Sequence, residues 1–352
     1  KQLFAVPRRT EITDWAGDLD DEDLIEREDM VVTITSGGYI KRTALAEFRS
    51  QRRGGKGLSG MATKEDDVVT TLFVANTHTE LLFFTTDGMV YRLKTWRLPL
   101  GGRTAKGKAI VNILPINAGV SIAALMPVDA PQAEWDDYQV IFATSQGDVR
   151  RNALSDFANV MRNGKIAMKL PEGVELIGAR MATENDDVML ITDSGRAIRF
   201  QTTDVRVFKG RDSTGVRGIS LADGDQLISM TIIRHFEASP ADRAAFQKQW
   251  VAEQKAAGID EAEVEDVVAE EAEEGETGGI EALSPERYAE MMLAQQFVLT
   301  VNEQGYGKRS SSYDFRISGR GGKGIKATDQ SKLDEIGKLI AAFPVEPTDQ
   351  IM

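Results

Sequence analysis

The sequence of 352 residues contains no cysteine and only two histidines, His78 and His235. Without cysteine the chain has no disulfide framework and no thiolate metal site, which fits a reducing compartment. The histidines lie 157 positions apart, so acid–base or metal chemistry based on histidine has little material, and we interpret both as packing or surface residues. No apolar run is long enough to cross a bilayer, and residues 1–10 do not form a signal peptide. These absences predict a soluble, cytoplasmic chain.

Basic residues are in the minority overall, because the formal net charge is −13, but the excess acid is confined to two segments. Residues 237–290 carry 16 Asp or Glu against 4 Lys or Arg, and residues 1–30 carry 10 against 4. The rest of the chain therefore has a net charge of +5. This mildly basic body removes the objection that a low isoelectric point would raise against nucleic-acid binding.

From Met30 onward the sequence repeats a unit of about 50 residues. Each unit has an apolar strand, a tight turn with glycine, and a second strand that ends in a cation, which is the pattern of a β-hairpin. The spacings between turn glycines are 50, 59, 48 and 110 residues, so the last pair encloses an insertion of about 60 residues. The five turn glycines are Gly38, Gly88, Gly147, Gly195 and Gly305.

A loop rich in glycine and cations follows each turn glycine by 17 to 20 residues, and a further apolar strand follows each later loop. Units of this length with four strands each predict the blades of a propeller-like array. Glycine allows close backbone approach and the cations suit phosphate oxygens, so we expect these loops to meet a polyanion without sequence readout. The strands after the loops are expected at 121–128, 175–182, 227–233 and 338–345.

The first loop has the highest density of cations and glycines, and it comprises Gln51, Arg52, Arg53, Gly54, Gly55, Lys56 and Gly57. In the later loops we expect phosphate contacts from Arg103, Lys106, Lys108, Arg162, Lys165, Lys209, Arg211, Arg217, Arg320, Lys323 and Lys326.

Other site chemistries fit the sequence less well. A nucleotide-binding P-loop requires Ser or Thr directly after Gly-Lys, whereas Lys56 and Lys323 are each followed by glycine and lie between strands. No aromatic platform interleaves the loops, and no recognition helix is present, so neither single-strand stacking nor base readout is indicated. Cations repeated around a curved rim instead favour a bent duplex, with strong salt dependence and little base specificity.

The acidic insertion covers residues 235–295. Ser239 and Asp242 form a capping-box pattern around Pro240, which predicts a helix through residue 257, and Ser284 with Pro285 predicts a second helix to residue 296. Residues 260–279 between them are rich in Glu, Ala and Val and are expected to be disordered. Two interpretations remain open for the insertion: a self-solvating tether, or an intramolecular polyanion that competes with an external one.

On these residues the chain resembles the C-terminal DNA-wrapping domain of the A subunit of bacterial DNA gyrase, a type IIA topoisomerase. Residues 51–57 are the same as that family's diagnostic heptapeptide and lie in the first blade, where the family has it. The resemblance runs over essentially the whole chain except the insertion. Supporting stretches lie at 8–12, 74–78, 110–115, 214–219 and 302–309.

The resemblance implies an all-β, six-bladed β-pinwheel in which neighbouring blades exchange strands. Duplex DNA would wrap around its basic rim in a positive sense, enabling ATP-dependent negative supercoiling by the holoenzyme. The implied partners are double-stranded DNA, the rest of the gyrase A protein, and the gyrase B protein in an A2B2 complex, in the bacterial cytoplasm with the nucleoid. The family's heptapeptide helps to close the ring and is required for wrapping, a role that we assign to residues 51–57 alone.

The sequence also departs from that family. The catalytic tyrosine domain is absent, so we expect no enzymatic activity and no cofactor for this fragment, with ATP and Mg²⁺ used by other domains. Residues 348–352 match the opening strand of a unit, so we expect five complete blades, a truncated sixth, and a fragment at both ends. The expected boundaries are an acidic linker at 1–29, a pinwheel at 30–352, and blades near 30–80, 81–138, 139–186, 187–234 and 296–348.

Two alternatives remain open at this point. The equivalent domain of topoisomerase IV has the same architecture but lacks an intact heptapeptide. A propeller-like scaffold that binds proteins would carry the basic loops incidentally, and its binding to DNA would show no steep dependence on salt.

Overall fold

The computed structural model describes residues 21–48, 67–209, 213–256, 282–328 and 333–346. Two compact units are distinguished: residues 1–80 with 93–113, and residues 81–92 with 114–352. The bounds of these two units do not coincide with the expected linker, insertion and blade boundaries, which remain predictions.

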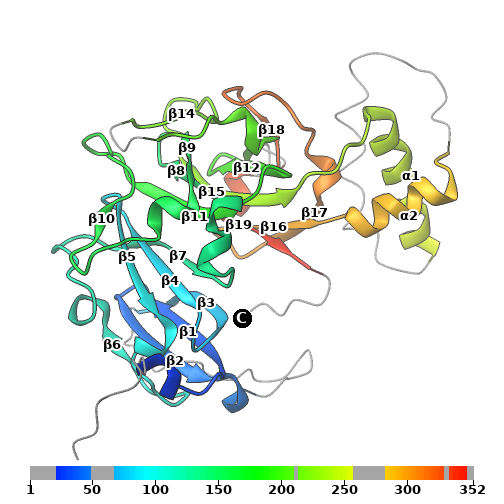
Figure 1. Ribbon diagram of the computed structural model, residues 1–352. Helices are drawn as coiled ribbons and strands as arrows, with labels where there is room; N and C mark the ends of the chain where they lie inside the picture. The colour runs from blue at the N-terminus through cyan, green and yellow to red at the C-terminus, as the bar shows by residue number, and fades with distance from the viewer. Residues whose placement is uncertain (1–20, 49–66, 210–212, 257–281, 329–332, 347–352) are drawn as a thin grey trace, which may run out of the picture. The chain divides into compact units, whose positions relative to one another are not determined.

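Within the described residues five hairpins form the backbone of the fold, as the repeat predicts (Figure 1). The turn glycines all have a φ of 73° to 81°, a left-handed conformation that other residues adopt at a cost. The tight turns therefore require glycine at these points, which is why the glycine marks the repeat. The hairpins are β1 (Asp29–Thr35) with β2 (Tyr39–Ala44), β4 (Glu80–Thr85) with β5 (Met89–Lys94), β8 (Gln139–Thr144) with β9 (Asp148–Ala153), β12 (Asp186–Thr192) with β13 (Arg196–Gln201), and β16 (Phe297–Asn302) with β17 (Gly307–Ser311).

A third strand pairs with the first strand of each hairpin. The strands expected after the later loops are confirmed to within one residue at each end. In the second unit, β7 lies against β11, β11 against β15, and β15 against β19, so these edge strands form a continuous series. The third strands are β3 (Val69–Asn76), β7 (Ile122–Val128), β11 (Leu176–Ala182), β15 (Leu227–Arg234) and β19 (Leu339–Val345).

The fourth strand of each complete sheet comes from the next repeat, which confirms the strand exchange implied by the resemblance. Each exchanged strand is two residues long and pairs with the second strand of the preceding hairpin. The fifth sheet, with the order β17-β16-β19, has three strands among the described residues. The exchanged strands are β6 (Lys108–Ala109) on β2, β10 (Lys165–Ile166) on β5, β14 (Val216–Arg217) on β9, and β18 (Ile325–Lys326) on β13.

Short 3-10 helices follow the hairpins and complete the repeat. In each repeat one 3-10 helix begins seven residues after the turn glycine. These helices are η3 (Leu45–Glu47), η4 (Thr95–Arg97), η7 (Leu154–Phe157), η8 (Thr202–Asp204) and η11 (Ser312–Asp314). The remaining short helices of the described residues are η2 (Asp21–Leu24), η5 (Ile110–Asn112), η6 (Gln132–Asp137) and α3 (Leu333–Ile336).

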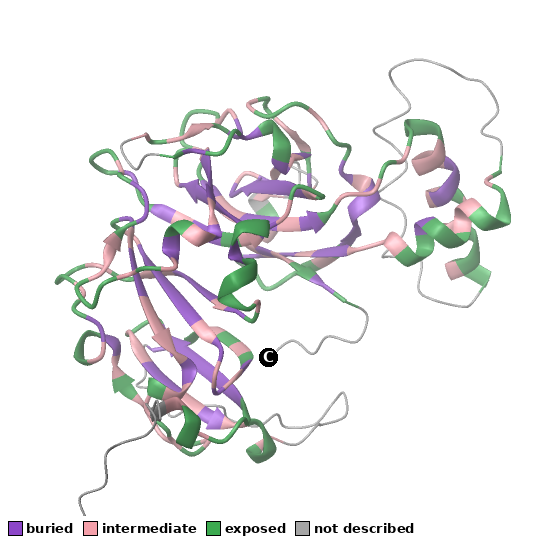
Figure 2. Ribbon diagram, viewed as in Figure 1, coloured by how far each residue is buried: buried purple, intermediate pink, exposed green. Residues whose placement is uncertain are grey.

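The hydrophobic core lies between neighbouring sheets, and the first hairpin strands are buried on both faces (Figure 2). Phe84 of β4, Phe142 of β8 and Phe157 of η7 meet edge to face, with ring centroids 5.3 to 5.9 Å apart. Phe142 and Ile141 are adjacent on β8 and pack into different clusters. A continuous apolar strand therefore joins two cores, which explains why the sequence shows no apolar–polar alternation there.

The insertion forms two helices, α1 (Pro240–Ala256) and α2 (Pro285–Ala294), as the capping patterns predict (Figure 1). Ser239 Oγ accepts from Asp242 N at 3.0 Å, and Ser284 Oγ accepts from Arg287 N at 3.2 Å. Phe246 of α1 and Met291 of α2 are buried together against Tyr313 of η11. The helices are therefore anchored to the fifth sheet. The segment expected to be disordered lies outside the described residues.

Candidate nucleic-acid interface

The basic loops are seated on the hairpin of the preceding repeat by their last glycine. Gly107, Gly164, Gly215 and Gly324 have a φ of 70° to 101° and directly precede the exchanged strands. A Cβ atom on Gly215 would lie 2.3 Å from the carbonyl oxygen of Val149, and one on Gly324 would lie 2.4 Å from that of Ala197. This close approach holds the end of each loop against a strand. The fold therefore gives the loop a fixed position, which a flexible surface turn would not have.

Two buried cations each donate hydrogen bonds to the backbone of one basic loop. Lys41 Nζ donates to the carbonyl oxygens of Gly102 at 2.9 Å and Arg103 at 2.7 Å. Arg150 Nη1 donates to the carbonyl oxygen of Ser213 at 2.5 Å. Lys41 and Arg150 have no exposed surface, and burial lowers the pKa of Lys41 against the opposing effect of Glu47. Their N–H groups donate to loop carbonyls, and because both side chains are buried they do not reach an external phosphate.

An arginine lies four residues after each turn glycine, and in the first four hairpins it donates to a carbonyl in or directly after the 3-10 helix of the next repeat. Arg42 Nε donates to Leu98 O at 2.9 Å, and Arg92 Nη1 donates to Ala158 O. Arg151 Nη1 donates to Val205 O at 3.1 Å, and Arg199 Nη1 donates to Ser312 O at 2.7 Å. These arginines therefore join consecutive repeats. The sequence pattern of a strand that ends in a cation does not by itself predict this role.

Arg199 also forms a buried ion pair. Its Nε and Nη2 atoms each lie 2.8 Å from Asp187 Oδ2, and Asp187 has no exposed surface. Burial lowers the pKa of Arg199, while Asp187 opposes that shift. His235 Nδ1 lies 2.8 Å from the other Asp187 oxygen, so this histidine is tied to the same buried group. The corresponding arginine of the fifth hairpin, Arg309, is exposed and lies over the ring of Phe297 at 4.9 Å.

The predicted phosphate contacts within the described residues all lie on the loops or exchanged strands, but they differ in exposure. Lys106 is half-buried, with Nζ 4.1 Å from the centroid of the Tyr39 ring. Arg103 and Lys165 are also half-buried, and Lys165 Nζ donates to Asp156 O. Arg211 and the heptapeptide 51–57 lie outside the described residues. The exposed members are Lys108, Arg162, Lys209, Arg217, Arg320, Lys323 and Lys326.

Two of the loops are joined to each other. Gly321 N donates to Gly218 O at 2.6 Å, and Ser220 N donates to Gly322 O at 2.8 Å. Arg320 Nη1 also donates to Arg217 O at 3.1 Å, while Arg320 Nε donates to Asp204 O at 3.0 Å. The structure thus brings together cations that are about 100 residues apart in sequence. Part of the hydrogen-bonding capacity of Arg320 is used inside the protein.

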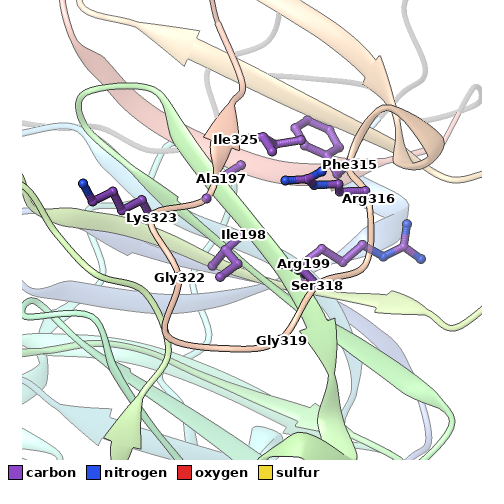
Figure 3. A pocket seen from close by; sticks show the side chains of 11 residues that line it. Ala197, Ile198, Arg199, Phe315, Arg316, Ser318, Gly319, Gly322, Lys323 and Ile325 are labelled. Atoms are coloured by element: carbon purple, nitrogen blue, oxygen red, sulfur yellow. Dashed lines mark hydrogen bonds between the residues drawn. The ribbon is translucent and has the colours of Figure 1, made fainter. Parts of the chain in front are cut away.

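A cavity of about 190 Å³ lies between β13 and the last basic loop (Figure 3). Its wall includes Ile198, Phe315 and Arg316, and Figure 3 shows Lys323 and Arg199 extending in opposite directions from it. Lys323 is exposed whereas Arg199 is held by Asp187. The cationic surface beside this cavity therefore includes Lys323, whereas Arg199 has a structural role through its contact with Asp187.

Some exposed cations near the loops were missed at the level of sequence. Arg206 and Arg316 are exposed and lie at the same position of the repeat, eleven residues after Gly195 and Gly305. They could have been found by aligning the repeats on the turn glycine, because they fall outside the glycine-rich stretch that drew attention to the loops. Arg206 lies over the ring of Phe208 at 4.4 Å.

The described residues offer little for other chemistry. They contain no group of three or more His, Asp or Glu side chains that could hold a metal ion. His78 contacts Glu22 Oε1 at 3.0 Å and Ile25 O at 2.8 Å, and so fastens η2 to the first sheet. None of the helices described is long and apolar enough to cross a membrane.

Comparisons with known proteins agree with this architecture. Curated relatives include the A subunit of DNA gyrase from Granulibacter bethesdensis, 48% identical over 349 residues, and its counterpart from Rickettsia bellii, 42% identical over 353 residues. These alignments cover 98% and 100% of the chain but 37% and 38% of the relatives, so the chain spans somewhat more than a third of their length.

Solved structures show the same fold at low sequence identity. The C-terminal domain of DNA topoisomerase IV matches with a TM-score of 0.53 and 19% identity, covering 92% of this chain and 95% of that one. The C-terminal domain of DNA gyrase A matches with a TM-score of 0.50 and 18% identity, covering 90% and 99%. The model of the family described as DNA gyrase C-terminal domain, beta-propeller, matches residues 29–76, 79–129, 138–183, 186–234 and 296–346. The chain belongs to this DNA gyrase C-terminal domain family.

Proposed function

We propose that this chain binds duplex DNA without sequence specificity and wraps it with positive chirality around its basic loops. The observation that carries the proposal is the recurrence of exposed cations on loops that the exchanged strands hold in equivalent positions of successive sheets. Phosphates of a bent duplex approach a protein surface at regular intervals, so regularly repeated cations suit them better than a single patch does.

The proposal extends to the assembly in which the chain acts. In a gyrase holoenzyme, a positively wrapped segment would be presented to the catalytic domains, where ATP-driven strand passage makes the supercoils negative. The partners would be the rest of the gyrase A protein and the gyrase B protein in an A2B2 complex, in the bacterial cytoplasm at the nucleoid. The family membership and the names of the curated relatives support this extension.

Residues 51–57 retain their proposed role in wrapping. Their offset from the first turn glycine matches that of the later loops, whose last glycine sits on a neighbouring hairpin. In the later repeats this offset leads directly into an exchanged strand. We propose that the heptapeptide acts in the same way on a strand edge, and that its cations act on DNA.

Topoisomerase IV is the nearest alternative, because its C-terminal domain has the same fold. The heptapeptide and the curated relatives, which are gyrase A proteins, favour gyrase. A protein-binding scaffold would leave the repeated exposure of cations without a function.

A topological assay tests the proposal. A nicked circular plasmid is sealed by ligase in the presence of increasing amounts of the chain, and the linking number is read on a gel. A positive shift that grows with protein supports chiral wrapping. Absence of a shift despite tight, salt-sensitive binding would overturn the wrapping, and absence of binding would overturn the function altogether.

A further inference from the structure

Exposed aliphatic side chains recur beside the basic loops. Leu100 is 66% exposed, Met161 76%, Val207 44% and Ile317 38%. Isolated exposed aliphatic residues are common on protein surfaces and need no explanation individually. These four are distinguished by where they fall in the repeat.

Three of the four occupy the same structural position. Leu100, Val207 and Ile317 each lie twelve residues after the turn glycine of their repeat. Each forms an isolated parallel bridge with an arginine of the preceding hairpin, namely Arg42, Arg151 or Arg199. In the third repeat this position is Asn159, and the exposed aliphatic residue is Met161, two residues further on. One exposed aliphatic side chain therefore lies one to three residues before the first predicted phosphate-contacting cation of each described loop.

The same side chains lie next to the cations proposed to meet phosphate. Met161 directly precedes Arg162, and Val207 lies two residues before Lys209. Leu100 and Ile317 each lie three residues before a loop arginine. A nucleic-acid backbone offers charged phosphates and apolar sugar carbons side by side, so paired cationic and aliphatic groups complement it. Proteins that bend duplexes commonly place apolar side chains in the minor groove, where the sugars approach them.

We propose that Leu100, Met161, Val207 and Ile317 contact the deoxyribose walls of the minor groove where a bent duplex faces the protein. This inference rests on the proposed function, and it adds an apolar component to an interface otherwise made of ion pairs. Buried aliphatic area contributes to affinity independently of counterion release. The apolar component is therefore insensitive to salt, whereas the cationic component weakens steeply as salt rises.

The test replaces all four residues by serine and measures duplex affinity over a range of salt concentrations. The expected result is a loss of about tenfold in affinity at every salt concentration, with an unchanged slope of log K against log salt. The control carries two serine substitutions at exposed aliphatic residues away from the basic loops, Val74→Ser and Ile340→Ser. These residues are 49% and 56% exposed on β3 and β19, each of which pairs with the first strand of its hairpin on the side away from the second strand. The control variant should bind as the unaltered chain does.

Inorganic polyphosphate serves as the second ligand, because it has the anions of a nucleic acid and no sugar. The serine variant should bind polyphosphate as tightly as the unaltered chain does. Equal losses for duplex and polyphosphate, a reduced salt slope, or unchanged duplex affinity would each overturn the proposal. Failure of the proposed function is distinguishable, because the unaltered chain would then show neither salt-sensitive duplex binding nor a linking-number shift.

Discussion

The cations of this chain fall into two groups that arise from the same repeat and differ in environment. Among those three or four residues after the turn glycine, Lys41, Arg150 and Arg199 are buried and donate to backbone carbonyls. Among those of the loops and exchanged strands, seven are exposed, including Arg162 and Lys323. Both groups recur with the same period in sequence. The period in sequence therefore does not distinguish a cation with a structural role from a cation with a binding role. Burial in the structure makes that distinction.

The difference also changes the electrostatic description of the surface. A net charge of +5 outside the two acidic segments counts both groups together. The buried cations are compensated by carbonyl dipoles or by Asp187, so they contribute little to an external field. An incoming polyanion meets the loop cations, and the following predictions test this division, from the largest expected effect to the smallest.

Replacing Arg199 by alanine should give the largest effect on stability. The change leaves Asp187 buried without its guanidinium partner and removes the side-chain donor of Ser312 O. Removal of one member of a buried ion pair typically costs about 3–5 kcal/mol. Chemical denaturation, followed by circular dichroism, should show this loss in the free energy of unfolding.

Arg309 provides the matched control, because it occupies the same position of the repeat and is exposed. Arg309→Ala should cost less than about 1 kcal/mol in the same experiment. Similar losses for the two variants would contradict the division of the arginines by burial.

Gly215→Ala tests whether loop seating depends on close backbone approach. Both the φ of 101° and the 2.3 Å approach to Val149 O oppose a Cβ atom, so we expect a loss of about 3 kcal/mol. Gly224 has a φ of 78° and open space around it, so Gly224→Ala should cost about 1 kcal/mol through backbone strain alone. Urea midpoints measured on both variants would give the difference. Equal midpoints would show that the seating contributes nothing to stability.

The lowered pKa of Lys41 should produce a small pH effect. Burial places the folded-state pKa below the usual value of 10.5, so the unfolded chain binds more protons between the two values. Stability associated with this group should therefore rise as pH increases through the window just below 10.5. The rise should disappear in Lys41→Met and persist in Lys108→Met, which alters an exposed lysine of β6. A persistent rise in Lys41→Met would assign the effect to another group.

Much of the fold could be predicted from the sequence, because its period is marked by turn glycines that no other residue replaces cheaply. The hairpins, the third strands and both helices of the insertion follow from local patterns of this kind. Residues alone did not reveal that Lys108, Lys165, Arg217 and Lys326 lie on strands of the preceding sheet. Two-residue strands carry no periodic signal, and tertiary contacts determine how they pair. The exchange of strands between blades was predicted only from the resemblance to the family.

The candidate interface could be predicted less completely than the fold. Composition located the loops, but it could not show that Arg320, although exposed like Lys323, donates to two backbone carbonyls of the protein. It also omitted Arg206 and Arg316, because they stand outside the glycine-rich stretches. Hydrogen bonds to distant carbonyls decide which cations remain available, and such bonds form only after the sheets assemble.

The most direct test of the account measures how the slope of log K against log salt changes when loop cations are removed. One exposed cation is replaced by alanine in each described loop: Lys108, Arg162, Lys209 and Lys323. The control variant loses the same charge from exposed positions elsewhere: Arg27, Arg234, Lys248 and Lys255. If the loops hold duplex DNA, the slope should become shallower by about 0.9 for each loop cation and stay unchanged in the control. Equal slopes for the loop variant and the unaltered chain would contradict the account.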